Sequence, residues 1–257
     1  GTRRIAFEAE RTFDSGPFTR LFGSIGLSRR ENPHFSDTPD RRTTWFARAE
    51  RRLPAHVMVA ADVTRASVRF GPDRARFWSP GVDVAFDTRR DPAFPSDAVL
   101  LQARWDSLRQ PDEDGIRRYS LDARGYKRVI GQTVAAVRAR LDRADAPLPP
   151  WEAWLLGGAG SVRGIRAGAF AGDQRFVASA EVRVPLSSPL GSSRAGFTVF
   201  ADVGAVAPHG ERLRDATTQR GGGAGLFLVT PVLTLNLEVA RGTGDDTRVH
   251  FSTGFAF

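Results

Sequence analysis

The chain has 257 residues, 41% of them hydrophobic, and a mean hydropathy of −0.30. No apolar run approaches the ~20 residues of a membrane-spanning helix, so a helical membrane protein is excluded, whereas a β-barrel, apolar only at every second position, is not. Cysteine is absent, which excludes disulfide bonds and thiolate metal sites.

The net charge of +8 comes almost entirely from arginine, because Lys127 is the only lysine. A strongly basic chain can indicate nucleic-acid binding. Here the arginines are spread along the chain at alternating positions and do not gather in one arm. We therefore expect attraction to lipopolysaccharide phosphates or to anionic contents of a lumen, and no nucleic-acid partner.

Alternation of apolar and polar residues recurs along the whole chain and predicts β-strands. In chain order the twelve alternating segments are 21–27, 45–50, 57–64, 82–87, 99–105, 119–124, 133–141, 176–184, 197–203, 223–229, 232–240 and 249–257. Residues 5–9 are a candidate thirteenth.

The connections between these segments alternate in length, as in barrels with long outer loops and short periplasmic turns. Long polar loops are predicted at 30–41, 107–116, 142–173 and 206–218, and tight links at 52–54 and 229–231. If the last strand descends to the periplasm, the loop 142–173 lies outside and the turn 89–96 lies on the periplasmic side.

The polar positions of the predicted strands carry many charges. They include Arg48, Glu50, Asp62, Asp83, Asp87, Arg104, Asp122, Arg124, Arg138, Arg140, Glu181, Arg183, Asp202 and Glu238. A soluble sandwich shows the same alternation, but burying so many charges in its core would cost several kcal/mol for each unpaired one. We therefore predict an all-β fold, an antiparallel transmembrane β-barrel of 12–14 strands, forming a single domain over 1–257 in the cell outer membrane.

The segment 249–257 places Phe251, Phe255 and Phe257 on one face. We expect these rings to face lipid as part of an aromatic girdle, and a terminal aromatic residue resembles the recognition signal of outer-membrane barrels. The alternative is an ordinary edge strand that happens to end on phenylalanine.

The long loop contains the run Gly157-Gly158-Ala159-Gly160-Ser161 followed by Val162-Arg163-Gly164-Ile165. Here the chain resembles the BamA/TamA superfamily of outer-membrane assembly and translocation proteins, the bacterial surface antigen type. The resemblance implies that the loop folds into the lumen and is anchored there by Val162, Arg163, Gly164 and Ile165. The fourth position departs from the family, which has an aromatic residue.

Two further stretches match that family. The run 200–204 is similar to its Phe-x-Asp-x-Gly strand, and the run 181–186 is similar to the end of the strand after the loop. The resemblance implies that Arg163 reaches a lumenal acid on these strands, and strand parity independently places Glu181 and Asp202 on the inner face. A bidentate, charge-assisted contact would suit this pairing.

The resemblance implies a role in outer-membrane protein insertion or assembly, translocation or lipid handling, through a deformable seam between the first and last strands. Members of the assembly and secretion branches carry POTRA domains, and we expect none in this chain. A passive pore or structural barrel, a surface enzyme and a soluble ligand-binding barrel are the alternatives.

We expect no enzyme activity, no catalytic residue, no cofactor and no metal, since the four histidines are dispersed. The expected partners are the lipid bilayer, lipopolysaccharide, and other outer-membrane proteins or the barrel assembly machinery.

Overall fold

A computed structural model describes residues 3–111, 113–188, 193–244 and 247–257, so residue 112 of the predicted loop 107–116 lies outside the described part. The chain forms one antiparallel sheet of 13 strands. In sheet order the strands are β1 (Arg3–Thr12), β2 (Arg20–Glu31), β3 (Pro39–Leu53), β4 (Val57–Phe70), β5 (Asp73–Asp87), β6 (Ala98–Leu108), β7 (Ile116–Arg128), β8 (Val134–Ala144), β11 (Gln174–Ser187), β12 (Arg194–Ala207), β13 (Gln219–Val229), β14 (Thr234–Gly242) and β15 (Arg248–Thr253). The twelve predicted segments correspond to twelve of these strands, although 133–141, 232–240 and 249–257 extend beyond the observed ends of β8, β14 and β15. Residues 5–9 lie in β1, and the predicted fold class is confirmed.

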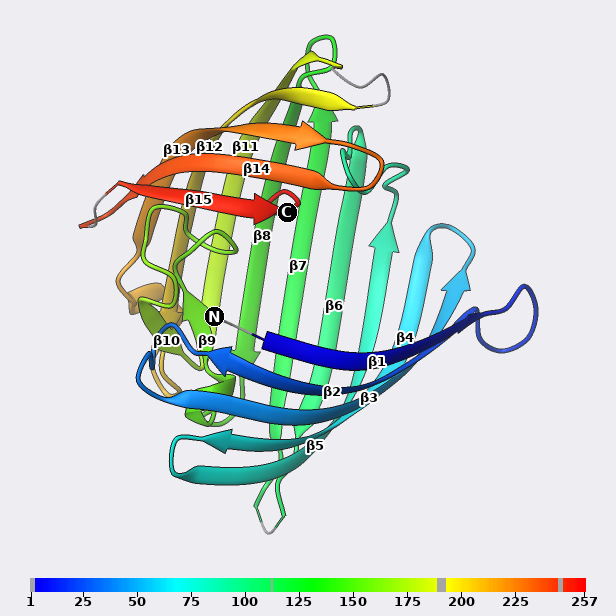
Figure 1. Ribbon diagram of the computed structural model, residues 1–257, viewed down its shortest axis with the longest axis vertical. Helices are drawn as coiled ribbons and strands as arrows, with labels where there is room; N and C mark the ends of the chain where they lie inside the picture. Colours follow the sequence, from blue (N-terminus) through cyan, green and yellow to red (C-terminus); the bar gives the residue numbers. More distant parts are fainter. Residues whose placement is uncertain (1–2, 112, 189–192, 245–246) are drawn as a thin grey trace.

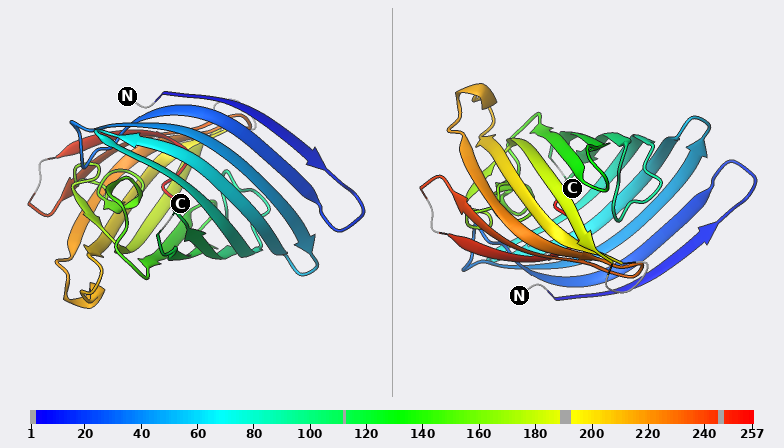
Figure 2. Two further views of the ribbon diagram at one scale, coloured as in Figure 1. Left: turned by 90° about the horizontal axis from the view of Figure 1, so that it is seen from below. Right: turned by 90° about the horizontal axis from the view of Figure 1, so that it is seen from above.

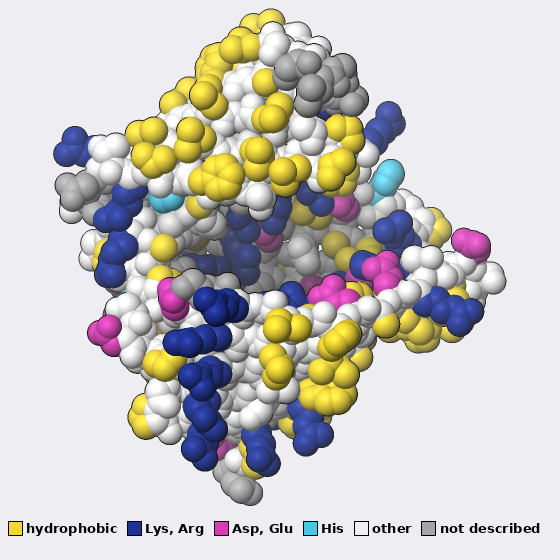
Figure 3. All heavy atoms as spheres, in the orientation of Figure 1, with side chains coloured by type: hydrophobic (Ala, Val, Ile, Leu, Met, Phe, Trp, Pro, Cys, Tyr) yellow, Lys and Arg dark blue, Asp and Glu magenta, His cyan; other side chains and the backbone are white. Residues whose placement is uncertain are grey.

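The strands curve around a central space that contains the long loop between β8 and β11 (Figures 1 and 2). This loop carries a short 3-10 helix, η1 (Pro150–Glu152), and a small hairpin of β9 (Trp154–Leu156) and β10 (Phe170–Gly172). A second 3-10 turn, η2 (Leu213–Asp215), lies between β12 and β13. Among the described residues, β1 pairs only with β2 and β15 only with β14. These two edges flank the hollow seen in Figure 3.

Side-chain alternation explains which face of each strand points inward. On β5, Val82 and Val84 are exposed on the outer face, whereas Asp83 between them is buried inside. The inward charges that the sequence indicated are each joined to an opposite charge. Arg104 of β6, for example, donates to Asp62 of β4 and Asp83 of β5, with both N–O distances 2.6 Å. This pairing offsets the cost of removing these charges from water.

The last strand is shorter than predicted, because β15 ends at Thr253 and not at Phe257. Gly254 has φ +86°, a left-handed conformation that glycine adopts without a steric penalty, and the chain turns there. Residues after the turn leave the sheet and lie inside the ring of strands, as the position of the C label in Figures 1 and 2 shows.

The predicted lipid-facing girdle is therefore wrong for Phe255 and Phe257, although Phe251 does lie exposed on the outer face. Phe257 is buried in an apolar cluster with Phe94 and Phe227, and the ring centroid of Phe255 lies 5.9 and 5.4 Å from those of the same two residues. Burial of two rings within the barrel outweighs the period-two pattern once glycine allows the turn.

Arg183 of β11 holds this inserted end. Its Nη2 donates to the carbonyl oxygen of Phe257 at 2.8 Å, and its guanidinium lies 3.8 Å from the ring centroid of Phe255. Arg138 of β8 donates to the carbonyl oxygen of Ala256 at 3.1 Å. A cation over an aromatic face is attracted by the ring quadrupole, so a buried arginine and two rings stabilise one another.

We expect Phe257→Ala to lower the free energy of unfolding by about 3–5 kcal/mol, the usual cost of deleting a buried aromatic side chain. The measurement is urea unfolding of the barrel refolded in detergent micelles. Phe251→Ala is the matched control, because the same atoms are removed from a side chain that is 69% exposed, against 6% for Phe257. Equal losses in both variants would contradict the inserted position of Phe257.

Candidate functional site

Arg163, at the tip of the long loop, is the centre of a buried ionic cluster. Its Nε and Nη2 donate to the two carboxylate oxygens of Asp202 at 2.8 and 2.9 Å, a bidentate contact. Its Nη1 donates to Glu181 at 2.9 Å and to Glu238 at 2.8 Å. These acids belong to β11, β12 and β14, so one side chain connects the loop to three strands of the wall.

The cluster is buried, since Arg163 is 0% exposed. Burial lowers the pKa of the Arg163 guanidinium, but hydrogen bonding and attraction from Asp202, with Glu181 and Glu238, outweigh it and raise the pKa above its ordinary value. The guanidinium also lies 3.4 Å from the ring centroid of Phe200. Arg163 therefore stays charged. Its N–H groups donate to the three carboxylates, and its guanidinium lies over the ring of Phe200.

The backbone of the loop tip packs against the strands as closely as the Arg163 side chain does. Gly164 has φ +88°, and a Cβ atom there would overlap the carbonyl carbon of Arg241 on β14. Its N–H donates to Nε2 of His250 on β15 at 3.1 Å. No residue with a side chain fits at position 164 while the loop keeps this path.

Two apolar residues of the loop tip lie on either side of Arg163 and Gly164 in the sequence. Val162 and Ile165 are buried in a cluster with Leu156 of β9 and Val177 of β11. Ile165 thus occupies an aliphatic environment at the position where the sequence departs from the family's aromatic residue. The apolar cluster excludes water from the ionic one, which strengthens the electrostatic contacts.

Glycines in the wall make room for the tip. A Cβ atom on Gly221 of β13 would overlap the carbonyl oxygen of Arg163, and one on Gly242 of β14 would overlap the side chain of Ile165. Gly221 thus permits the close approach of the loop backbone to the wall.

A second contact holds the loop at η1. Glu152 accepts from Arg42 of β3 and from Arg118 of β7, both at 2.6 Å. Arg42 also donates to the carbonyl oxygen of Trp151 at 2.7 Å, and the Trp151 ring lies 5.9 Å from that of Phe70. The loop is therefore attached to β3, β4 and β7 as well as to the strands around Arg163.

The structure brings together the residues that the sequence singled out. Arg163 meets both Glu181 and Asp202, and Val162, Gly164 and Ile165 lie packed around it. Glu238 had been placed on the inner face but not assigned to Arg163. The contacts of Phe200, His250 and Glu152 were missed, because no spacing in the sequence relates them to the loop tip or to their partners.

Within the described residues, no helix is long and apolar enough to cross a membrane, and no group of three or more acidic, histidine or cysteine side chains is placed to hold a metal ion.

A curved antiparallel sheet with apolar side chains outside, paired charges inside and a loop inserted into its lumen defines an outer-membrane β-barrel. Residues 61–257, well over half of the chain, match the Omp85 superfamily domain. The chain belongs to the Omp85 superfamily, which confirms the predicted resemblance and the predicted location in the cell outer membrane.

Solved structures with the same fold include BamA from Haemophilus ducreyi lacking POTRA domains 1–3, with a TM-score of 0.77 and 14% identity. CdiB from Escherichia coli gives 0.73 and 13%, and CdiB from Acinetobacter baumannii gives 0.62 and 16%. The matches cover 98%, 99% and 99% of this chain but only 62%, 53% and 50% of those chains, respectively. No curated protein sequence matches the chain.

We expect Arg163→Ala to release the loop, because Asp202 and Glu238 lose their cation and Glu181 keeps only Arg183; breaking one buried ion pair costs about 3–5 kcal/mol. The chain has no cysteine, so Ser161→Cys, at a position 7% exposed, gives a single reporter. Maleimide labelling of this reporter should be slow in the parent and fast with Arg163→Ala. Arg212→Ala, which removes an exposed arginine between β12 and β13, is the control; slow labelling in both variants would contradict the anchoring role.

We expect Gly221→Ala to speed maleimide labelling of the same Ser161→Cys reporter without changing any charge, because the new methyl group overlaps the Arg163 carbonyl and displaces the loop. Gly222→Ala is the matched control, since a Cβ there meets only the carbonyl oxygen of Phe200, at 3.4 Å. Equal labelling rates in the two alanine variants would contradict the close approach of loop and wall.

Proposed function

We propose that this barrel assists the insertion or translocation of outer-membrane polypeptides by offering the edge of β15 as a pairing template. The observation that carries the proposal is that, among the described residues, β15 pairs with β14 alone. An exposed strand edge presents unpaired N–H and C=O groups, to which an incoming strand can add. Omp85 membership and the folds of BamA and CdiB support this kind of role.

The register identifies which groups on β15 are available. Gly254 N–H donates to the carbonyl oxygen of Thr234, which makes that pair a hydrogen-bonded one. Because hydrogen-bonded pairs alternate in an antiparallel ladder, His250 and Ser252 also bond to β14, whereas Val249 and Phe251 direct their N–H and C=O groups to the free edge. β15 has six residues and β14 nine, so this edge is held by a short ladder.

The inserted loop connects this edge to the site described above. Gly164 contacts His250 on β15 and Arg163 contacts Glu238 on β14, so the loop tip supports the last two strands from inside. In this proposal the tip keeps β14 and β15 in position while the outer edge of β15 exchanges partners. No covalent chemistry is involved.

A passive pore is the second candidate, and its test is electrical. The loop occupies the lumen and is attached to the wall through the ion pairs of Glu152 and Arg163, among other contacts. We expect low, intermittent conductance in planar bilayers for the parent chain and a larger, steadier conductance for Arg163→Ala. A steady open channel in the parent would favour the pore and count against the template proposal.

We expect Val249→Pro to abolish assisted folding, because proline removes an N–H that faces the free edge while the bonds of His250 and Ser252 to β14 remain. The measurement is the folding rate of a urea-denatured outer-membrane barrel added to liposomes that contain this protein. Val249→Ala, which keeps the N–H, is the control.

With Val249→Pro the rate should fall to that of protein-free liposomes, while both variants keep the heat stability of the parent. An unchanged rate with proline, or no assistance by the parent itself, would exclude the template role.

A further inference from the structure

Five arginines form a straight row across the outer face of the barrel, on β1 to β5. Arg3 pairs in register with Arg29, Arg29 with Arg41, Arg41 with Arg69, and Arg69 with Arg74. All five are exposed. Figure 3 shows a column of Lys and Arg side chains crossing this part of the surface. Since neighbouring strands lie ~4.8 Å apart, the row places five positive charges within about 20 Å.

The row is electrostatically unfavourable for the protein alone. Like charges directly opposite one another on paired strands are destabilising, and this arrangement repeats at four successive pairs. Within the described part of the chain, Arg3, Arg41, Arg69 and Arg74 have no ion pair with a carboxylate, in contrast to the arginines of the lumen. The acids nearest the row in sequence are Glu31, Asp40 and Asp73, and Asp40 is paired with Arg42 on the inner face. A ligand that supplies several negative charges would remove the repulsion.

The surroundings of the row indicate an amphiphilic ligand. A groove of about 430 Å³ is lined by Arg3, Arg29, Arg41 and Arg69 together with the exposed cross-strand pair Ile5 and Leu27. Cations and apolar side chains therefore face the same space. This combination suits a phosphate group attached to an acyl chain.

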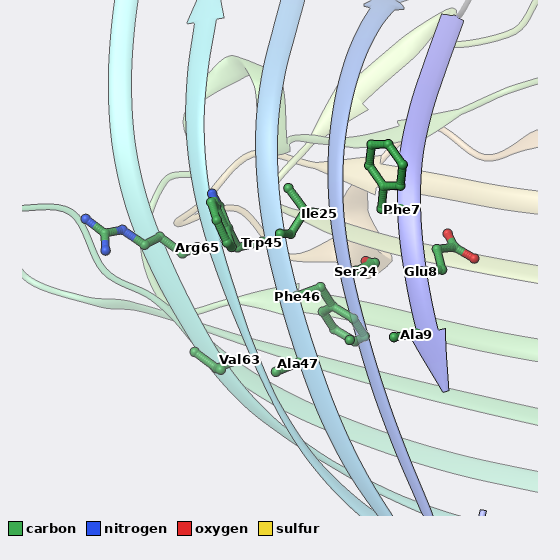
Figure 4. A pocket seen from close by; sticks show the side chains of 11 residues that line it. Phe7, Glu8, Ala9, Ser24, Ile25, Trp45, Phe46, Ala47, Val63 and Arg65 are labelled. Atoms are coloured by element: carbon green, nitrogen blue, oxygen red, sulfur yellow. The ribbon is translucent and has the colours of Figure 1, made fainter. Parts of the chain in front are cut away.

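Farther along the same strands the surface is mainly apolar. A second groove, of about 420 Å³, is lined by Phe7, Ile25, Trp45 and Val63, with Arg65 beside Trp45 (Figure 4). Hydrocarbon chains that continue past the arginine row would meet these side chains. The row also lies at the end of the strands where the long loop between β8 and β11 joins the wall, the end that the sequence predicts to lie outside.

We propose that the arginine row is a docking site for the phosphate groups of lipopolysaccharide in the outer leaflet. Guanidinium groups bind phosphate oxygens through paired N–H donors, and the regular strand spacing presents several of them to one multiply phosphorylated lipid. The acyl chains would lie along the apolar grooves. The site is on the outer face of β1 to β5 and uses no group of the β15 edge, so it does not depend on the proposed insertion role.

The test titrates the refolded protein, in uncharged detergent micelles, with purified lipopolysaccharide and follows the thermal unfolding midpoint, which rises with occupancy. The triple variant Arg29→Gln, Arg41→Gln, Arg69→Gln should bind about tenfold more weakly or worse, because three exposed ion pairs are lost. Without the lipid, the same variant should be at least as heat-stable as the parent, since repulsion is relieved. A loss of stability there would contradict the repulsion argument.

The control triple is Arg11→Gln, Arg52→Gln, Arg90→Gln, which removes the same charge from exposed positions at the other end of the strands. It should bind the lipid as the parent does. If both triple variants bind lipopolysaccharide equally weakly, the effect is one of net charge, and the proposed site is wrong. Unchanged binding by the variant of the arginine row would also overturn the site. Dephosphorylated lipopolysaccharide and inorganic phosphate should each fail to raise the unfolding midpoint. A rise with either probe would contradict recognition of a phosphorylated lipid.

Discussion

The insertion of Arg163 among three carboxylates is the interaction on which the arrangement of the lumen depends. One side chain connects the loop to β11, β12 and β14, and its backbone neighbour Gly164 extends the connection to β15. A charge this deeply buried is retained only when it is fully paired. The loop tip, the facing glycines and the inner acids are therefore one mutually dependent unit, in which changing any member leaves a buried group without its partner.

A second set of buried arginines lies beside this cluster and holds the C-terminal residues. Arg183 and Arg138 hold residues 255–257, and Arg183 also donates to Glu181 at 2.8 Å, which in turn accepts from Arg163. Glu181 thus joins the loop cluster to the inserted end of the chain. Because both clusters include Glu181 of β11, a change in either cluster acts directly on the electrostatics of the other.

Arginine serves two opposite purposes on the two faces of this sheet. Inside, it is paired with carboxylates and fixes the lumen and its loop. Outside, on β1 to β5, it stands in a row in which Arg3, Arg41, Arg69 and Arg74 have no carboxylate partner among the described residues, so an anionic ligand would balance their charge. The +8 net charge of the chain is therefore consistent with an internally compensated lumen and a cationic outer surface, and a bilayer carrying phosphate groups provides the counter-charge.

The sequence by itself determined the strands, because period-two alternation is a local property that survives in any context with one polar and one apolar face. It also determined Arg163 and its partners Glu181 and Asp202, through a motif and strand parity. It could not determine the path of residues 254–257, where Gly254 allows a turn and burial of Phe255 and Phe257 then outweighs alternation. Nor could it relate Glu152 to Arg42 and Arg118, or align Arg3, Arg29, Arg41, Arg69 and Arg74, because strand register and loop docking are set by contacts between residues far apart in the chain.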